Sequence, residues 1–242
     1  MSSGPHDSAG VPWSGRELTG TGFDDDTGGA DPGLVAALEH PGDGPALMAA
    51  VSAARLLVPI VAEPVSVEET GGLVAEKQTD MAAVTLVAPD GQRALPVFSS
   101  LRALADWDPQ ARPVPVTAGR AAQAAVSERC DVMVLDVAGP RPVVLRPSMV
   151  WALAQQRDWL PAHDDPAVER AVAAAVRPEP SVRGHALGAG RPEGQGILAV
   201  TLELEPGLAA EEVQAVATRV GERLATDGEL RARVDGLAFS IR

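Results

Sequence analysis

The stretch from Met81 to Trp107 constrains the fold of this chain most, because it predicts a strand, a tight turn, a second strand and a helix in succession. Met81 to Val87 is an almost continuous apolar run, which is typical of a strand covered on both faces. Pro89, Asp90 and Gly91 supply the turn, with the glycine where a positive φ is needed. We therefore expect a hairpin whose first strand lies centrally in a sheet.

The second half of this stretch predicts a strand-to-helix junction. Ala94 to Phe98 forms the second strand, and Ser99 and Ser100 are placed to cap a following helix. Phe98 ends a buried strand, so we expect its side chain in the core. The helix shows apolar residues at helical spacing, which are Leu101, Leu104 and Trp107.

Composition excludes several classes of function. A formal net charge of −13 disfavours contacts with a phosphate backbone, so no nucleic-acid partner is expected. The single cysteine excludes an internal disulfide framework, and the only lysine, Lys77, lies in a polar stretch typical of a solvated loop. The chain shows no export signal and no apolar run of about 18 residues. We expect a cytoplasmic protein that does not contact a membrane.

The chain is long enough for two domains, and three segments are expected. Residues 1–30 are rich in Gly, Ser and Asp and predict a disordered tail. A first domain over 31–160 is expected to hold the central hairpin and flanking helices. A second domain over 161–242 has the predicted order α-β-β-α-β, after a linker near residues 157–165. The expected fold class is α/β (α+β), with two small mixed sheets.

No catalytic or metal site is predicted, and no cofactor is expected. Cys130 falls at the end of a predicted helix, where the helix dipole raises the pKa of a thiol. His163 to Asp165 is the nearest approach to a metal-ligand cluster, but Asp165 is better explained as a helix cap. Asp24 to Asp26 lacks the rest of a calcium loop. Gly188 to Gly194 leads into a strand, which favours a hairpin loop over a phosphate loop.

The order of several short segments resembles a known family. These segments are Leu57-Val58-Pro59, Val84-Thr85-Leu86, Asp90-Gly91, Leu95 to Ser100, Trp107 and Arg112-Pro113-Val114. The arrangement resembles the N-terminal domain of SseB family proteins over about Leu34 to Leu160, and the remainder resembles the C-terminal domain that follows it in many members. The usual family motif is Phe-Thr-Ser where this chain has Phe98-Ser99-Ser100, a change that keeps the hydroxyl. The resemblance implies the fold and no known active site.

Our first hypothesis is a non-enzymatic protein-interaction or regulatory module with an unknown protein partner, because no catalytic constellation is present. The alternative is a small-molecule-responsive regulator or cryptic enzyme that acts at the junction Phe98 to Ser100. N–H groups of a first helical turn favour carboxylates, and neighbouring apolar side chains can anchor a peptide. If the serine caps the helix and the aromatic residues fill the core, the junction is scaffold instead. The candidate interaction surface consists of Phe98, Ser99, Ser100, Leu101 and Trp107.

Overall fold

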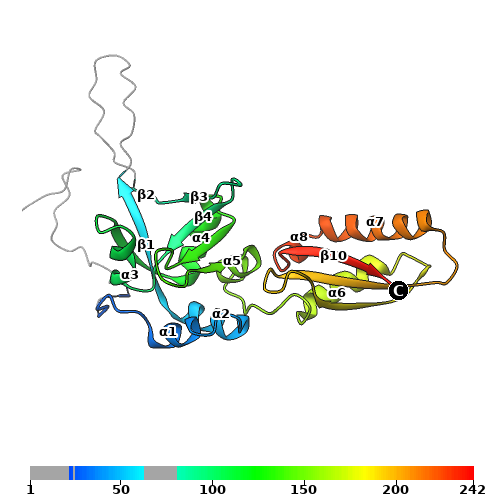
Figure 1. Cartoon of the computed structure of the whole chain (residues 1–242), viewed down its shortest axis with the longest axis horizontal. Coiled ribbons are helices and arrows are strands. Elements are labelled where there is room, and N and C mark those ends of the chain that lie inside the picture. The colour runs from blue at the N-terminus through cyan, green and yellow to red at the C-terminus, as the bar shows by residue number, and fades with distance from the viewer. Residues whose placement is uncertain (1–21, 24, 63–80) are drawn as a thin grey trace, which may run out of the picture.

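The computed structural model of the chain describes residues 22, 23, 25–62 and 81–242, and Figure 1 shows two lobes side by side. The N-terminal lobe runs from α1 (Pro32–Leu38) to α5 (Pro147–Ala154). The C-terminal lobe runs from α6 (Pro166–Val176) to β10 (Gly236–Ile241). Each lobe combines helices with small sheets, so the predicted mixed α/β fold class is confirmed.

The N-terminal lobe contains two small sheets. The first is antiparallel with the order β2-β1-β5, and its strands are β1 (Arg55–Ala62), β2 (Met81–Ala83) and β5 (Arg112–Thr117). The second has the order β3-β4-β6-β7, and its strands are β3 (Leu86–Val87), β4 (Arg93–Val97), β6 (Val132–Leu135) and β7 (Val143–Leu145). Within it β4 and β6 run parallel. Two backbone hydrogen bonds between Leu57 and Phe98, of 2.8 and 2.9 Å, join the sheets.

The prediction of one central strand over Met81 to Val87 is wrong. The structure divides this run into β2 and β3, and each lies at the edge of a different sheet. The Val84 N–H donates to the Pro59 carbonyl at 3.1 Å, after which the chain leaves the first sheet and pairs with β4. Val87 is 66% exposed. An apolar run alone does not show which strands flank it, because distant segments supply those neighbours.

The turn and the junction that follow this run are as predicted. Gly91 has a φ of +88°, and the Ala88 N–H donates to the Gln92 carbonyl at 2.8 Å across the turn. This positive φ explains the glycine, because other residues rarely adopt it. Beyond β4 the chain enters α3 (Leu101–Trp107), with Ser100 as its N-cap. The hairpin therefore leads directly into the predicted helix.

Four helices and both sheets enclose the core of the N-terminal lobe. Besides α1 and α5 these are α2 (Gly44–Ala53) and α4 (Ala118–Ser127). The α4 helix buries a narrow stripe of small side chains at helical spacing, namely Ala118, Ala121, Ala122 and Ala125. Alanine on this face lets α4 pack closely against α5 and the strands beneath it. This core holds the ends of β4 and β6 in fixed positions.

The C-terminal lobe has one sheet with the order β10-β9-β8. A hairpin of β8 (Val182–Ala189) and β9 (Ile197–Leu204) is followed by α7 (Ala210–Thr226), the short α8 (Gly228–Arg231) and then β10 parallel to β9. The predicted order α-β-β-α-β is present, with α8 as an addition. Alternate residues of β9 are buried, namely Leu198, Val200 and Leu202. They share a hydrophobic cluster with valines of α6 and α7. The lobe has its own hydrophobic cluster.

Two predicted boundaries look different in the structure. The predicted tail over 1–30 falls mostly outside the described residues, but residues 25–30 contact Arg55 and Leu101, so contacts with the N-terminal lobe include residues before the predicted start of the first domain. In the predicted linker, Trp159 packs against the N-terminal core and Ala162 belongs to the C-terminal cluster. This segment is therefore part of both cores. Whether the lobes are separable domains stays a prediction.

Candidate functional site

The strand-to-helix junction places its two aromatic residues in a small core of their own. Phe98 is fully buried, and its ring centroid lies 5.3 Å from that of Trp107 at an interplanar angle of 33°. Leu57 and Leu104 complete this cluster. The prediction that Phe98 is a core residue is confirmed, as expected for the alternative in which the aromatic residues fill the core. A large aromatic side chain fills the space where the two sheets meet, which explains its burial.

Ser99 is held by a carboxylate that the sequence analysis did not single out. The Ser99 N–H donates to Asp136 Oδ1 at 2.8 Å, and the Ser99 hydroxyl donates to Asp136 Oδ2 at 2.7 Å. Asp136 directly follows β6 with a φ of +51°, and its own N–H donates to the Val97 carbonyl at 2.9 Å. Parallel neighbouring strands end at the same edge of a sheet, so polar residues that follow two such strands come close together. A polar residue after each strand was therefore the signal in the sequence that could have indicated this pair.

Asp136 orients this serine. Nucleophilic serines in enzymes are activated by an adjacent base, most often a histidine or a lysine. Among the described residues that line the space beside Ser99 there is no histidine, lysine or cysteine. Ser99 is also only 5% exposed. The pair of Ser99 and Asp136 therefore ties together the ends of β4 and β6.

Three N–H groups at the start of α3 have partners within the chain. The Ser100 hydroxyl accepts from the Ala103 N–H at 3.1 Å, and the Ser100 carbonyl accepts from the Leu104 N–H at 3.1 Å. The Leu101 N–H donates to the Gly28 carbonyl at 2.9 Å. The expected anion-binding surface of free N–H groups is therefore reduced, because the cap and the segment before α1 occupy these three donors.

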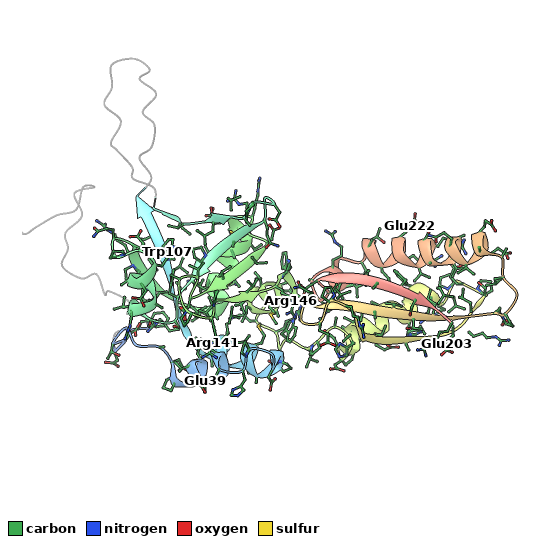
Figure 2. The ribbon with its side chains drawn as sticks, in the orientation of Figure 1. Glu39, Trp107, Arg141, Arg146, Glu203 and Glu222 are labelled. Atoms are coloured by element: carbon green, nitrogen blue, oxygen red, sulfur yellow. The ribbon has the colours of Figure 1, made fainter. Side chains whose placement is uncertain are left out.

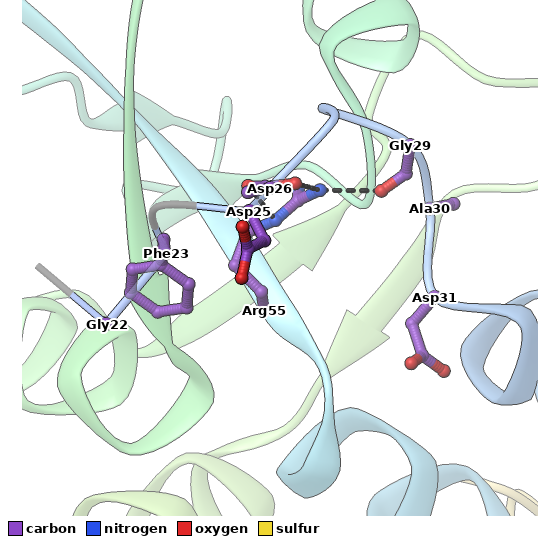
Figure 3. Close-up of a pocket in the computed structure, with 8 residues that line it drawn as sticks. All are labelled: Gly22, Phe23, Asp25, Asp26, Gly29, Ala30, Asp31 and Arg55. Carbon is purple, nitrogen blue, oxygen red and sulfur yellow. Dashed lines mark hydrogen bonds and ion pairs between the residues drawn. The ribbon is translucent and has the colours of Figure 1, made fainter.

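Arg55 anchors that segment, as Figure 3 shows. Its guanidinium forms an ion pair with Asp26, with Nε and Oδ2 2.7 Å apart, and donates to the Gly29 carbonyl. It also donates to the Ser99 carbonyl at 3.1 Å. A cavity of about 390 Å³ lies beside this contact, and Asp31 on its rim caps α1. Two of the carboxylates around this cavity therefore have structural roles.

A second cavity of about 300 Å³ lies on the other side of the junction, and we call it the junction groove. Three chain segments form it: α1, the junction with α3, and the turn between β6 and β7. Glu39 and Arg141, labelled in Figure 2, lie on its rim. The lining residues are Val35, Leu38, Glu39, Ser99, Ser100, Arg102, Ala103, Asp106, Asp136, Gly139, Pro140 and Arg141.

The candidate surface is thus divided by the structure. Ser99 and Ser100 line the junction groove, whereas Phe98 and Trp107 belong to the small core beneath. Leu101 is 45% exposed and lies under Gly28, outside the groove lining. The sequence located the junction correctly, but the groove uses residues of α1 and of the turn after β6 that lie far away in the chain.

The remaining candidates from the sequence lie outside the junction groove. No group of three or more His, Cys, Asp or Glu side chains in the described part of the chain is arranged to hold a metal ion. Cys130 is buried, and this burial raises the pKa of its thiol. Asp165 accepts from the Ala167 N–H at 2.7 Å as the predicted cap of α6, and it also pairs with Arg233 at 2.7 Å. Nε2 of His163 lies 3.6 Å from Oδ2 of its neighbour Asp164.

Comparison with known protein families identifies the N-terminal lobe. The model of the SseB protein N-terminal domain matches residues 33–152, from α1 into α5. The chain belongs to the SseB family through this domain. The SseB domain contains every segment of the junction groove, and the match ends before the C-terminal lobe, whose resemblance to a second SseB domain stays a prediction.

Searches of the curated proteins and of the solved structures found no match to this SseB family chain. Within residues 22, 23, 25–62 and 81–242, no helix is both long enough and apolar enough to cross a membrane.

Proposed function

We propose that this SseB family protein is a non-enzymatic interaction module that binds a segment of a partner protein in the junction groove. The observation that carries this proposal is the groove itself, which combines exposed apolar side chains with a rim of opposite charges. Val35 is 46% exposed on its wall, beside Leu38 and Ala103. Peptide-binding grooves typically use apolar contacts for affinity and surrounding charges for specificity.

The floor of the groove favours binding over chemistry. Asp136 already accepts two hydrogen bonds from Ser99, so the buried polar groups there are paired. Paired groups on the ends of two core strands do not rearrange easily, and a partner would meet a surface that is already formed. The hydroxyl of Ser100 caps α3. Neither serine is left for a nucleophilic role.

The rim defines the partner segment that fits. Arg102 is 92% exposed, with Asp106 4.0 Å away, and Arg141 and Glu39 are exposed as well. A cavity of about 300 Å³ accommodates one or two side chains of a peptide. The partner segment is therefore a short peptide with an apolar anchor residue and charged residues of both signs beside it.

Site-specific photocrosslinking tests this proposal. A benzophenone amino acid at Val35 is expected to capture a partner that the same group at Val144 does not capture. Val144 is a matched control because it is a valine in the same lobe, is 50% exposed, and does not line the groove. Identical capture at the two positions would contradict the proposal.

Charge reversal then tests the rim with the captured partner. Arg141→Glu should weaken its binding, whereas Arg120→Glu, an exposed arginine on α4 outside the groove, should not. Both variants should keep the melting temperature of the wild type, because neither side chain is buried. Equal affinity of the Arg141→Glu variant and the wild type would place the interaction elsewhere.

A further inference from the structure

A third cavity, of about 280 Å³, lies between the lobes, and we call it the inter-lobe cavity. Arg146, labelled in Figure 2, marks its position where the two lobes meet. The walls come from the start of α2, the start of α5, the segment around Trp159, the β8–β9 hairpin and the start of β10. Apolar side chains of both lobes line it, among them Met149, Trp159 and Ile197.

Asp235, just before β10, fixes the polar wall. Its Oδ1 accepts from the Ser148 N–H at 2.7 Å, and its Oδ2 accepts from the Ser148 hydroxyl and from Arg146 Nε, both at 2.9 Å. The N-cap residue of α5, Arg146, makes no capping hydrogen bond of its own, so a carboxylate from the other lobe caps this helix. The Asp235 side chain is 6% exposed. Both of its oxygens therefore accept hydrogen bonds from the N-terminal lobe.

One spare hydrogen-bond donor remains at the cavity. Arg146 Nη1 donates to the Gly194 carbonyl at 2.6 Å, and its guanidinium lies 5.6 Å from the centroid of the Trp159 ring. Arg146 Nη2 donates to no described residue. Arg233 also lines the cavity, but its Nε is inaccessible to a molecule of the size of water, so this atom is not a donor to a ligand there.

The walls approach closely because they carry glycine. A Cβ at Gly44 would lie 2.8 Å from Cζ3 of Trp159, and a Cβ at Gly196 would overlap the carboxylate of Asp235. Gly196 also has a φ of +70°, which favours glycine. A Cβ at Gly196 would also lie 2.8 Å from Nε of Arg146, which belongs to the other lobe, so the lobes approach each other closely at this wall of the cavity.

We propose that the inter-lobe cavity binds a small, mostly apolar, uncharged molecule that carries a carbonyl-type hydrogen-bond acceptor. The charge of Arg146 is balanced by Asp235, and that of Arg233 by Asp165 and Glu229, so no surplus positive charge selects an anion. The apolar walls take the body of the ligand, and Arg146 Nη2 donates to its acceptor. A molecule held by both lobes stabilises their arrangement.

Binding of benzamide, followed by NMR of the indole N–H groups, tests this site. The chain has four tryptophans, and a Trp159→Phe variant assigns the relevant signal. Benzamide is expected to shift the Trp159 signal saturably and to leave those of Trp107 and Trp151 unchanged. Benzoate, of the same shape but charged, is expected to bind more weakly. No Trp159 shift, or tighter binding of benzoate, would overturn the proposal.

Two variants on one strand provide the control. Ala189 lines the cavity and Ala186 does not, and both are exposed residues of β8. Ala189→Leu narrows the cavity and should weaken benzamide binding at least about tenfold, which is 1.4 kcal/mol, whereas Ala186→Leu should not. Equal binding by both variants would refute the site. If Ala189→Leu loses a dispersed spectrum, Arg146→Lys replaces it, because lysine keeps the charge beside Asp235 and removes the Nη2 donor.

Discussion

Glu179 should make the stability of the C-terminal lobe depend on pH in the acid range. Its side chain is 3% exposed and lies between α6 and β8. Arg219 and Arg223, both on α7, approach its carboxylate at 2.5 and 2.8 Å. The hydrogen bonds from Arg219, followed by those from Arg223, lower the pKa of Glu179 from 4.5 to about 2, against the opposing effect of burial.

The sign of the effect follows from this pKa. As the pH falls, Glu179 is protonated near pH 4.5 in the unfolded chain and only near pH 2 in the folded chain. The contribution of its ionised carboxylate to the free energy of unfolding is therefore complete above pH 4.5 and is lost as the pH falls to 2. Because one unit of pKa difference corresponds to 1.36 kcal/mol, the full contribution to the free energy of unfolding is about 3 kcal/mol. Because the Arg219 and Arg223 side chains are 47% and 36% exposed, solvent screening reduces it, and we expect about 1–2 kcal/mol.

Urea unfolding of the wild type and of Glu179→Gln at several pH values measures this contribution. The variant should be less stable than the wild type at pH 7, and the difference in free energy of unfolding should shrink between pH 4.5 and pH 2. Glu205→Gln is the matched control, because Glu205 pairs with Arg183 on the surface and is 46% exposed, so its replacement should change little. A difference between Glu179→Gln and the wild type that is constant from pH 7 to pH 2 would refute the reasoning.

Three further predictions concern the junction and the contact between the lobes. Phe98→Ala should lower the free energy of unfolding by about 3–5 kcal/mol, measured with urea, because it empties the space where the two sheets meet; a loss within error would show that the ring is not packed. Ser99→Ala should cost about 1–3 kcal/mol in the same assay, because a partly buried carboxylate oxygen of Asp136 loses its donor. Ser100→Ala should cost about 1 kcal/mol through loss of the helix cap, and no effect of either substitution would contradict these contacts. Asp235→Ala should weaken the contact between the lobes by about 2–3 kcal/mol and speed tryptic cleavage after Arg157, and an unchanged cleavage rate would show that the carboxylate does not couple them.

Local signals in the sequence determined the elements and their ends. Asp31, Ser100, Thr117 and Asp165 each accept a hydrogen bond from an N–H group two or three residues along the chain. Such contacts depend only on residue type and spacing, which the sequence displays directly. The turn at Gly91 and the element order of the C-terminal lobe were predictable for the same reason, as was the burial of Phe98.

Only the tertiary structure decided which elements are neighbours and which groups are free. The partner of Ser99 lies 37 positions away, and that of Ser148 lies 87 positions away. The Gly28 carbonyl accepts a hydrogen bond from the Leu101 N–H at the start of α3, a donor without a partner in its own helix. The run from Met81 to Val87 divides between two sheets. These contacts depend on how the chain packs around two cores. Periodicity and capping patterns describe one segment at a time, so neither the junction groove nor the inter-lobe cavity was visible in them.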